Sequence, residues 1–94
     1  MYTHEFKTAV VERLVALPAV MQVNYLQYWG EQIFFVALDP WSDDAEQSAR
    51  AALASLLAEL GAHAPKARLR FSRAGDHLPS SATLYRKGQA VVNA

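Results

Sequence analysis

The segment IFFVALDPWSDDAEQSARAALASLLAELGAHAPKARLRF, residues 33–71, decides the fold of this chain. It opens with the uninterrupted apolar run Ile33–Leu38, which is typical of a strand that other elements cover on both faces. A long stretch rich in alanine and leucine follows, and a second strand-like stretch closes the segment. Strand, helix and strand in this order predict a right-handed crossover, so the two strands should run parallel in one sheet.

The helix in the middle of this segment is indicated at both of its ends. Asp43, followed three residues later by Glu46, resembles a capping box, and Ser42 is a rival N-cap. Gly61 stands where a left-handed C-terminal cap is expected, and Pro65 prevents the helix from resuming. The residues between the caps form one apolar stripe at helical spacing. These are Ala45, Ala49, Ala52, Leu53, Leu56, Leu57 and Leu60.

Residues 66–72 alternate between two kinds of side chain, which is typical of a strand with one buried face. The apolar set is Ala67, Leu69 and Phe71. The polar set is Arg68, Arg70 and Ser72. Residues beyond this strand allow two interpretations. Residues 79–84 can form a short helical turn, or residues 83–85 can pair with residues 89–92 as a hairpin; we expect the helical turn, followed by an extended tail.

Before the decisive segment, the sequence predicts a helix and a hairpin. Thr3 is a suitable N-cap, and Pro18 disfavours helical conformation at the residue before it, so the helix should end there. Residues 21–29 are rich in Val, Tyr and Trp and predict a strand that turns at Gly30-Glu31 and pairs with residues 33–38. The apolar face of the helix consists of Phe6, Val10, Leu14 and Leu17.

The predicted order is helix, strand, strand, helix, strand and a short last element. We therefore expect one α+β domain over residues 1–94. It should be a two-layer sandwich, with a small mixed sheet of three to four strands and both helices on one face. The uncovered face of the sheet is then a natural interaction surface.

Composition excludes several classes of site. The 94 residues include no cysteine, so a disulfide framework, a thiolate metal site and a cysteine nucleophile are excluded. The four glycines stand singly at expected turns and form no phosphate-binding loop, and we expect no cofactor. The longest uncharged stretch, residues 14–30, is broken by Pro, Asn and Gln and cannot span a membrane. We expect a cytoplasmic protein.

Charge is balanced overall but unevenly placed. Residues 1–60 carry three basic and eight acidic side chains, a net charge of −5, and residues 61–94 carry six and one, a net charge of +5. The two halves could therefore meet head to tail, or across a two-fold axis. Five basic side chains form a candidate patch for nucleic-acid phosphates, with Tyr85 or Tyr25 as a stacking platform. They are Arg68, Arg70, Arg73, Arg86 and Lys87. We favour the alternative, a solvated strand face paired in part with acids of the hairpin.

No catalytic or metal site is expected. Asp76 and His77 with Ser80 and Ser81 are residue types found in hydrolases. However, neighbours on one loop rarely reach triad geometry, and turn and capping roles explain them. The three histidines are scattered, without the spacing of a metal site. They are His4, His63 and His77.

Four aromatic side chains are the best functional clue: Tyr25, Tyr28, Trp29 and Trp41. So small a core cannot bury all of them, and exposed aromatics are enriched at protein interfaces. We therefore expect a protein-interaction surface that binds a second copy of the chain, as a homo-oligomer, or a protein partner. The alternative is that these rings close the core and the open end of the sheet.

The order of elements, the Arg-Leu-Arg-Phe strand ending at Phe71 and the closing Leu-Tyr-Arg-Lys at residues 84–87 resemble the C-terminal domain of the bacterial enhanced-serine-sensitivity protein family. The resemblance covers about residues 5–88 and rests mostly on hydrophobic pattern. Leu84 departs from it, because the family more often has an aromatic residue there. The resemblance implies a noncatalytic bacterial domain and carries over no catalytic residue.

Overall fold

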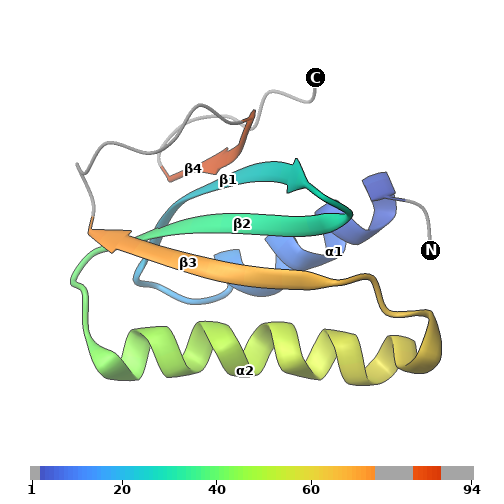
Figure 1. Cartoon of the computed structure of the whole chain (residues 1–94). Helices are drawn as coiled ribbons and strands as arrows, with labels where there is room; N and C mark the ends of the chain where they lie inside the picture. The colour runs from blue at the N-terminus through green and yellow to red at the C-terminus, as the bar shows by residue number, and fades with distance from the viewer. Residues whose placement is uncertain (1–2, 74–81, 88–94) are drawn as a thin grey trace.

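The computed structural model describes residues 3–73 and 82–87 (Figure 1). Two helices pack against a four-stranded mixed sheet that is not closed, which confirms the predicted α+β class. The sheet order is β3-β2-β1-β4. The elements along the chain are α1 (Thr3–Val15), β1 (Val20–Tyr28), β2 (Glu31–Leu38), α2 (Asp43–Leu60), the 3-10 turn η1 (Gly61–His63), β3 (Ala67–Arg73) and β4 (Ala82–Arg86).

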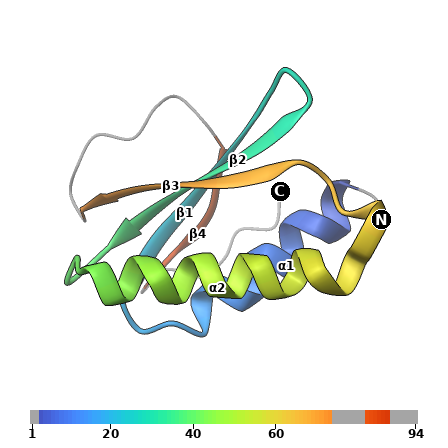
Figure 2. The ribbon, with the colours of Figure 1, turned by 60° about the horizontal axis from the view of Figure 1, so that its bottom comes forward.

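Both helices lie on the same face of the sheet, as Figure 2 shows. The predicted face of α1 is confirmed for Phe6, Val10 and Leu14, which are all fully buried. Burial of each such side chain stabilises the fold by about 1.5–3 kcal/mol. Leu17, the fourth predicted member of this face, lies beyond the end of the helix and is only partly buried. From α2 the core receives Ala49, Leu53 and Leu56. Because alanine is small, its backbone can approach the sheet closely.

The predicted parallel pairing is confirmed, because β2 and β3 lie side by side and run in the same direction. Phe34 lies beside Leu69, and both belong to the core under the helices. Successive side chains alternate across a strand, so the next pair, Phe35 and Arg70, lies on the face that no helix covers. We call this second face the open face.

Two local predictions are wrong by one residue. Asp43, the first candidate for the N-cap of α2, is the first helical residue, and the rival candidate Ser42 is the N-cap, with its Oγ accepting a hydrogen bond from Ala45 N at 3.0 Å. The β1–β2 turn consists of Trp29 and Gly30, because Tyr28 already pairs with Glu31. Both turn residues have positive φ, 51° and 76°, which is the backbone of the two-residue turn that suits the twist of a hairpin.

The preferred interpretation of the last segment is also wrong. Residues 82–86 form β4, which pairs antiparallel with β1 and places Tyr85 beside Val23 and Arg86 beside Gln22. The physical reason is the edge of β1, which without β4 would expose a row of unpaired backbone groups. Residues 79–81 and 89–92, which the two interpretations also used, lie outside the described residues.

Among the described residues, no helix is both long and apolar enough to cross a membrane.

Candidate interaction surfaces

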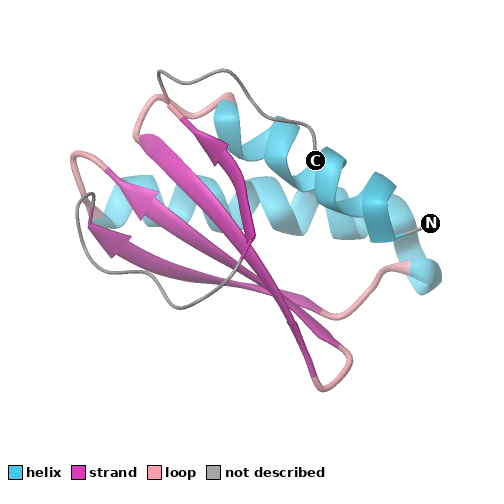
Figure 3. Cartoon of the chain, turned by 90° about the horizontal axis from the view of Figure 1, so that it is seen from above, coloured by secondary structure: helices cyan, strands magenta, loops and turns pink. Residues whose placement is uncertain are grey.

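The β1–β2 hairpin projects beyond its neighbours in the sheet. Within the described residues, β3 pairs no further along β2 than Gln32, and β4 pairs no further along β1 than Tyr25. The end of the hairpin, residues 28–31, therefore lacks a strand on either side. Figure 3 shows it extending past the rest of the sheet. We call residues 28–31 the hairpin tip.

The hairpin tip carries two exposed aromatic rings. Trp29 is 86% exposed and Tyr28 is 57% exposed. Their rings meet edge to face, with centroids 5.9 Å apart. Trp29 is also the one non-glycine residue with positive φ in the described part of the chain. This conformation costs an L-residue with a Cβ about 1–2 kcal/mol, and turns of this kind favour Asn-Gly instead.

Tyr25 does not belong to an exposed surface, contrary to its assignment to the candidate interface. It is 8% exposed, and its ring lies 5.3 Å from that of Phe34 in the core. Lys7 Nζ lies 4.7 Å from the ring centroid on the side of α1. The Tyr25 hydroxyl is buried without a hydrogen-bond partner. Burial raises the pKa of this phenol above its ordinary value.

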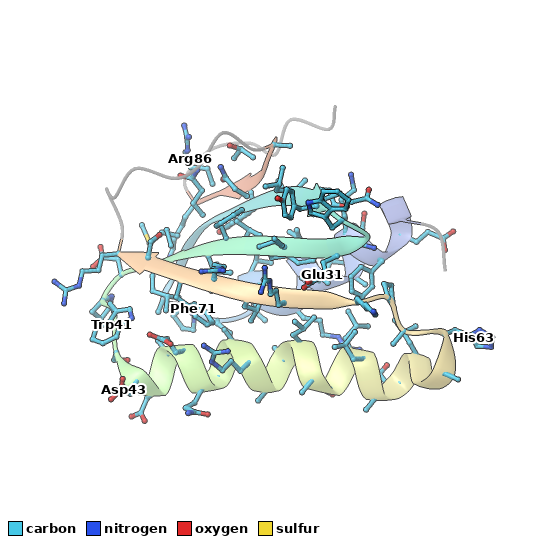
Figure 4. All side chains as sticks on the ribbon, in the orientation of Figure 1. Glu31, Trp41, Asp43, His63, Phe71 and Arg86 are labelled. Carbon is cyan, nitrogen blue, oxygen red and sulfur yellow. The ribbon has the colours of Figure 1, made fainter. Side chains whose placement is uncertain are left out.

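Trp41 is separated from the hairpin tip by the full length of β2. Figure 4 places it near the start of α2, whereas Glu31 lies at the opposite end of the sheet. Trp41 is 41% exposed, but its indole Nε1 donates a hydrogen bond to Glu46 Oε2 at 2.6 Å. The Arg73 guanidinium lies 5.4 Å from its ring centroid. The four aromatics therefore do not form one cluster, and only Tyr28 and Trp29 share an exposed surface.

The five basic residues are divided between the two edges of the sheet. Arg68, Arg70 and Arg73 lie on β3 and Arg86 on β4, with Lys87 directly after it. Three strand spacings, about 14 Å, separate the two edges. Instead of one patch, the sheet therefore carries a basic group at each edge.

Most of these cations already have partners within the chain. Arg86 Nε donates to Gln22 Oε1 at 3.3 Å, and Lys87 Nζ donates to the Pro18 carbonyl oxygen at 2.9 Å. Arg68 forms an ion pair with Glu31 at 3.3 Å. The expected pairing of the strand with an acid of the hairpin is confirmed for this residue. The basic and acidic halves of the sequence do not form separate lobes, because β3 and β4 flank β1 and β2 in one sheet.

Sequence reasoning missed an aromatic side chain beside the arginines. In register across the open face, Phe35 lies between Arg70 on β3 and Asn24 on β1. The sequence does contain a signal for this side chain, because Phe34 and Phe35 are adjacent in a predicted strand and must therefore point to opposite faces of the sheet. It can be used only once the register between β2 and β3 is known.

The other candidate residues add no further site. Asp76, His77, Ser80 and Ser81 lie outside the described residues. His63 is exposed in η1. Within residues 3–73 and 82–87, no group of three or more histidine or acidic side chains is placed to hold a metal ion. Comparison of the chain with models of known families, with characterised proteins and with solved structures finds no match.

Proposed function

We propose that this chain is a noncatalytic protein-interaction domain that uses the hairpin tip to bind a second copy of itself or a partner protein. The observation that carries the proposal is Trp29, which combines a positive φ of 51° with an exposure of 86%. A large ring in a strained turn contributes little to the stability of the free chain. Its presence is accounted for if the ring is buried on binding.

The composition of the hairpin tip supports this proposal. Tryptophan and tyrosine are enriched among the few residues that dominate binding energy at protein interfaces. The Tyr28 and Trp29 rings are in contact with each other and are both exposed at the hairpin tip, so a partner can enclose both rings without moving the core. Strained backbone that persists in a folded protein also concentrates at functional positions.

The sharpest test is Trp29→Asn, because it separates folding from binding. Asparagine followed by Gly30 is the favoured turn sequence, so this variant should unfold at the same or a higher urea concentration than the parent chain. Its association should be lost. Sedimentation equilibrium over a wide range of protein concentration measures the mass of both chains. Trp41→Ser is the matched control, because it removes the second tryptophan from a site remote from the hairpin tip and should leave association unchanged.

The control variant also provides a direct signal. The chain has two tryptophans, so Trp29 is the sole tryptophan in Trp41→Ser, and its emission should shift to the blue as the protein associates. A chain that is monomeric at every concentration would refute self-association. The partner version is then tested in cells with a photocrosslinking residue at position 28. The absence of any adduct that depends on Trp29 would refute it too.

Binding of single-stranded nucleic acid is a second candidate, favoured by the position of the half-buried Phe35 beside the exposed Arg70. Bases stack on aromatic rings that have arginines nearby. It is the weaker candidate because Ile33 and Ala37, which flank Phe35 on the open face, are each only 5% exposed. The platform is therefore narrow.

Anisotropy of a labelled oligo-dT tests this candidate. Binding should weaken steeply between about 50 and about 200 mM salt. It should also weaken in Phe35→Ala and in Arg70→Ala. An affinity that does not change with salt concentration, or that neither substitution alters, would refute nucleic-acid binding.

A further inference from the structure

The outer edge of β3 is a free strand edge with a defined pattern of backbone groups. In the sheet order, β2 is the neighbour of β3 on one side, and no described strand lies on the other. The hydrogen bond from Gln32 N to Lys66 O, at 2.8 Å, sets the phase of the parallel ladder. Alternate residues of such a ladder direct both backbone groups to the neighbouring strand. The N–H and C=O groups of Ala67, Leu69 and Phe71 therefore point to the free edge.

The side chains along this edge are basic and exposed. Arg68, Arg70 and Arg73 are all exposed, and β3 carries no acidic residue. Arg68 is held by Glu31, and Arg73 lies against the Trp41 ring. Arg70 forms no ion pair with any described residue, although it is in the middle of the strand. The free edge thus presents an uncompensated positive charge next to its unpaired backbone groups.

A second copy of β3 is a poor occupant of this edge. Two β3 strands related by a two-fold axis would run antiparallel, with open-face residues opposite one another. A pairing centred on Leu69 sets Arg68 against Arg70, and one centred on Arg70 sets that residue against its own copy. Like charges directly opposite one another destabilise a strand pair. Arginines on an edge therefore discourage pairing between copies of this chain.

The same charges favour an acidic strand. We propose that the free edge of β3 binds an extended segment of a partner protein whose acidic side chains recur at every second residue, as a fifth strand of the sheet. The backbone groups of Ala67, Leu69 and Phe71 would hold the segment, as in other cases of strand addition. Its acidic side chains would lie on the open face beside Arg68 and Arg70. This edge meets the hairpin tip only through the Arg68–Glu31 ion pair and uses neither of its aromatic rings, so the inference does not rest on the function proposed above.

The probe for a direct test is a labelled synthetic peptide of alternating glutamate and valine, titrated by fluorescence anisotropy. Arg70→Glu should weaken its binding by about tenfold or more, because attraction is replaced by repulsion at the centre of the edge. The matched control is Arg86→Glu, which makes the same charge change at the opposite edge of the sheet and should alter affinity by less than about twofold. Equal losses in the two variants would overturn the proposal, because they would indicate a response to overall charge.

Two further measurements separate strand addition from other forms of binding. On binding, the amides of Leu69 and Phe71 should exchange with solvent at least about tenfold more slowly, because they become hydrogen-bonded. Unchanged exchange would overturn strand addition. Oligo-dT that displaces the peptide and binds more tightly would overturn the choice of an acidic protein segment. The Trp29→Asn chain should bind the peptide as well as the parent does, which keeps this test independent of the hairpin tip.

Discussion

Phe34 and Phe35 are adjacent in the sequence, but they lie on opposite faces of β2, and alanine substitutions should distinguish them sharply. Phe34 is fully buried, with its ring centroid 6.0 Å from that of Phe6 and 5.3 Å from that of Tyr25. Phe35 is half-buried on the open face. Truncation of a fully buried phenylalanine costs about 3–5 kcal/mol. Phe35→Ala removes about half as much buried area and should cost about 1–1.5 kcal/mol.

Urea denaturation measures both changes. With an m-value of about 1.5 kcal/mol/M for a domain of this size, Phe34→Ala should lower the midpoint by about 2–3 M and Phe35→Ala by about 0.7–1 M. Far-UV circular dichroism is the proper signal, because Trp29 and Trp41 are both exposed in the folded chain and report little on unfolding.

Phe34→Leu extends the measurement if Phe34→Ala is too unstable to study. It keeps most of the apolar volume and loses both ring contacts, which are worth about 1–3 kcal/mol together. Equal costs for Phe34→Ala and Phe35→Ala would refute the assignment of the two faces. The placement of the Phe35, Arg70 and Asn24 side chains on the open face would then be refuted as well.

Three other changes test the capping, burial and charge contacts of the fold. Ser42→Ala should lower the free energy of unfolding by about 1 kcal/mol, because Ala45 N loses its acceptor, whereas Ser42→Asp should restore it in the same urea titration. Tyr25→Phe should raise stability by up to about 1 kcal/mol, because the lost hydroxyl is buried and unpaired. The raised pKa of Tyr25 predicts stability that is full below the ordinary value of 10.0 and falls as the pH rises from there through the folded-state pKa; thermal melts of Tyr25→Phe should lack this alkaline component. Arg13→Met should cost less than about 1 kcal/mol, because its 2.6 Å ion pair with Glu59 is solvent-exposed, and a loss that persists unchanged in high salt would contradict this explanation.

Local signals in the sequence determined the elements from α1 to β3. The apolar spacing of Phe6, Val10 and Leu14, the caps around α2 and the alternation of residues 66–72 each reflect contacts with near neighbours along the chain. Such patterns depend on the periods of helix and strand, which are the same in every fold. The crossover from β2 to β3 followed from them, because the handedness of that connection is nearly invariant.

The three-dimensional fold alone decided which distant residues meet. β4 was misassigned because its conformation depends on pairing with β1, some 60 residues earlier in the chain. The same cause separated Trp41 from Trp29, buried Tyr25, and divided the basic residues between two edges. Register and strand order are set by pairing between segments far apart in the chain, and a shift of one residue exchanges the two faces of a strand. The sequence therefore determined which residues were candidates for an interaction surface. The strand order and register of the sheet decided which of these candidates lie together on the same surface.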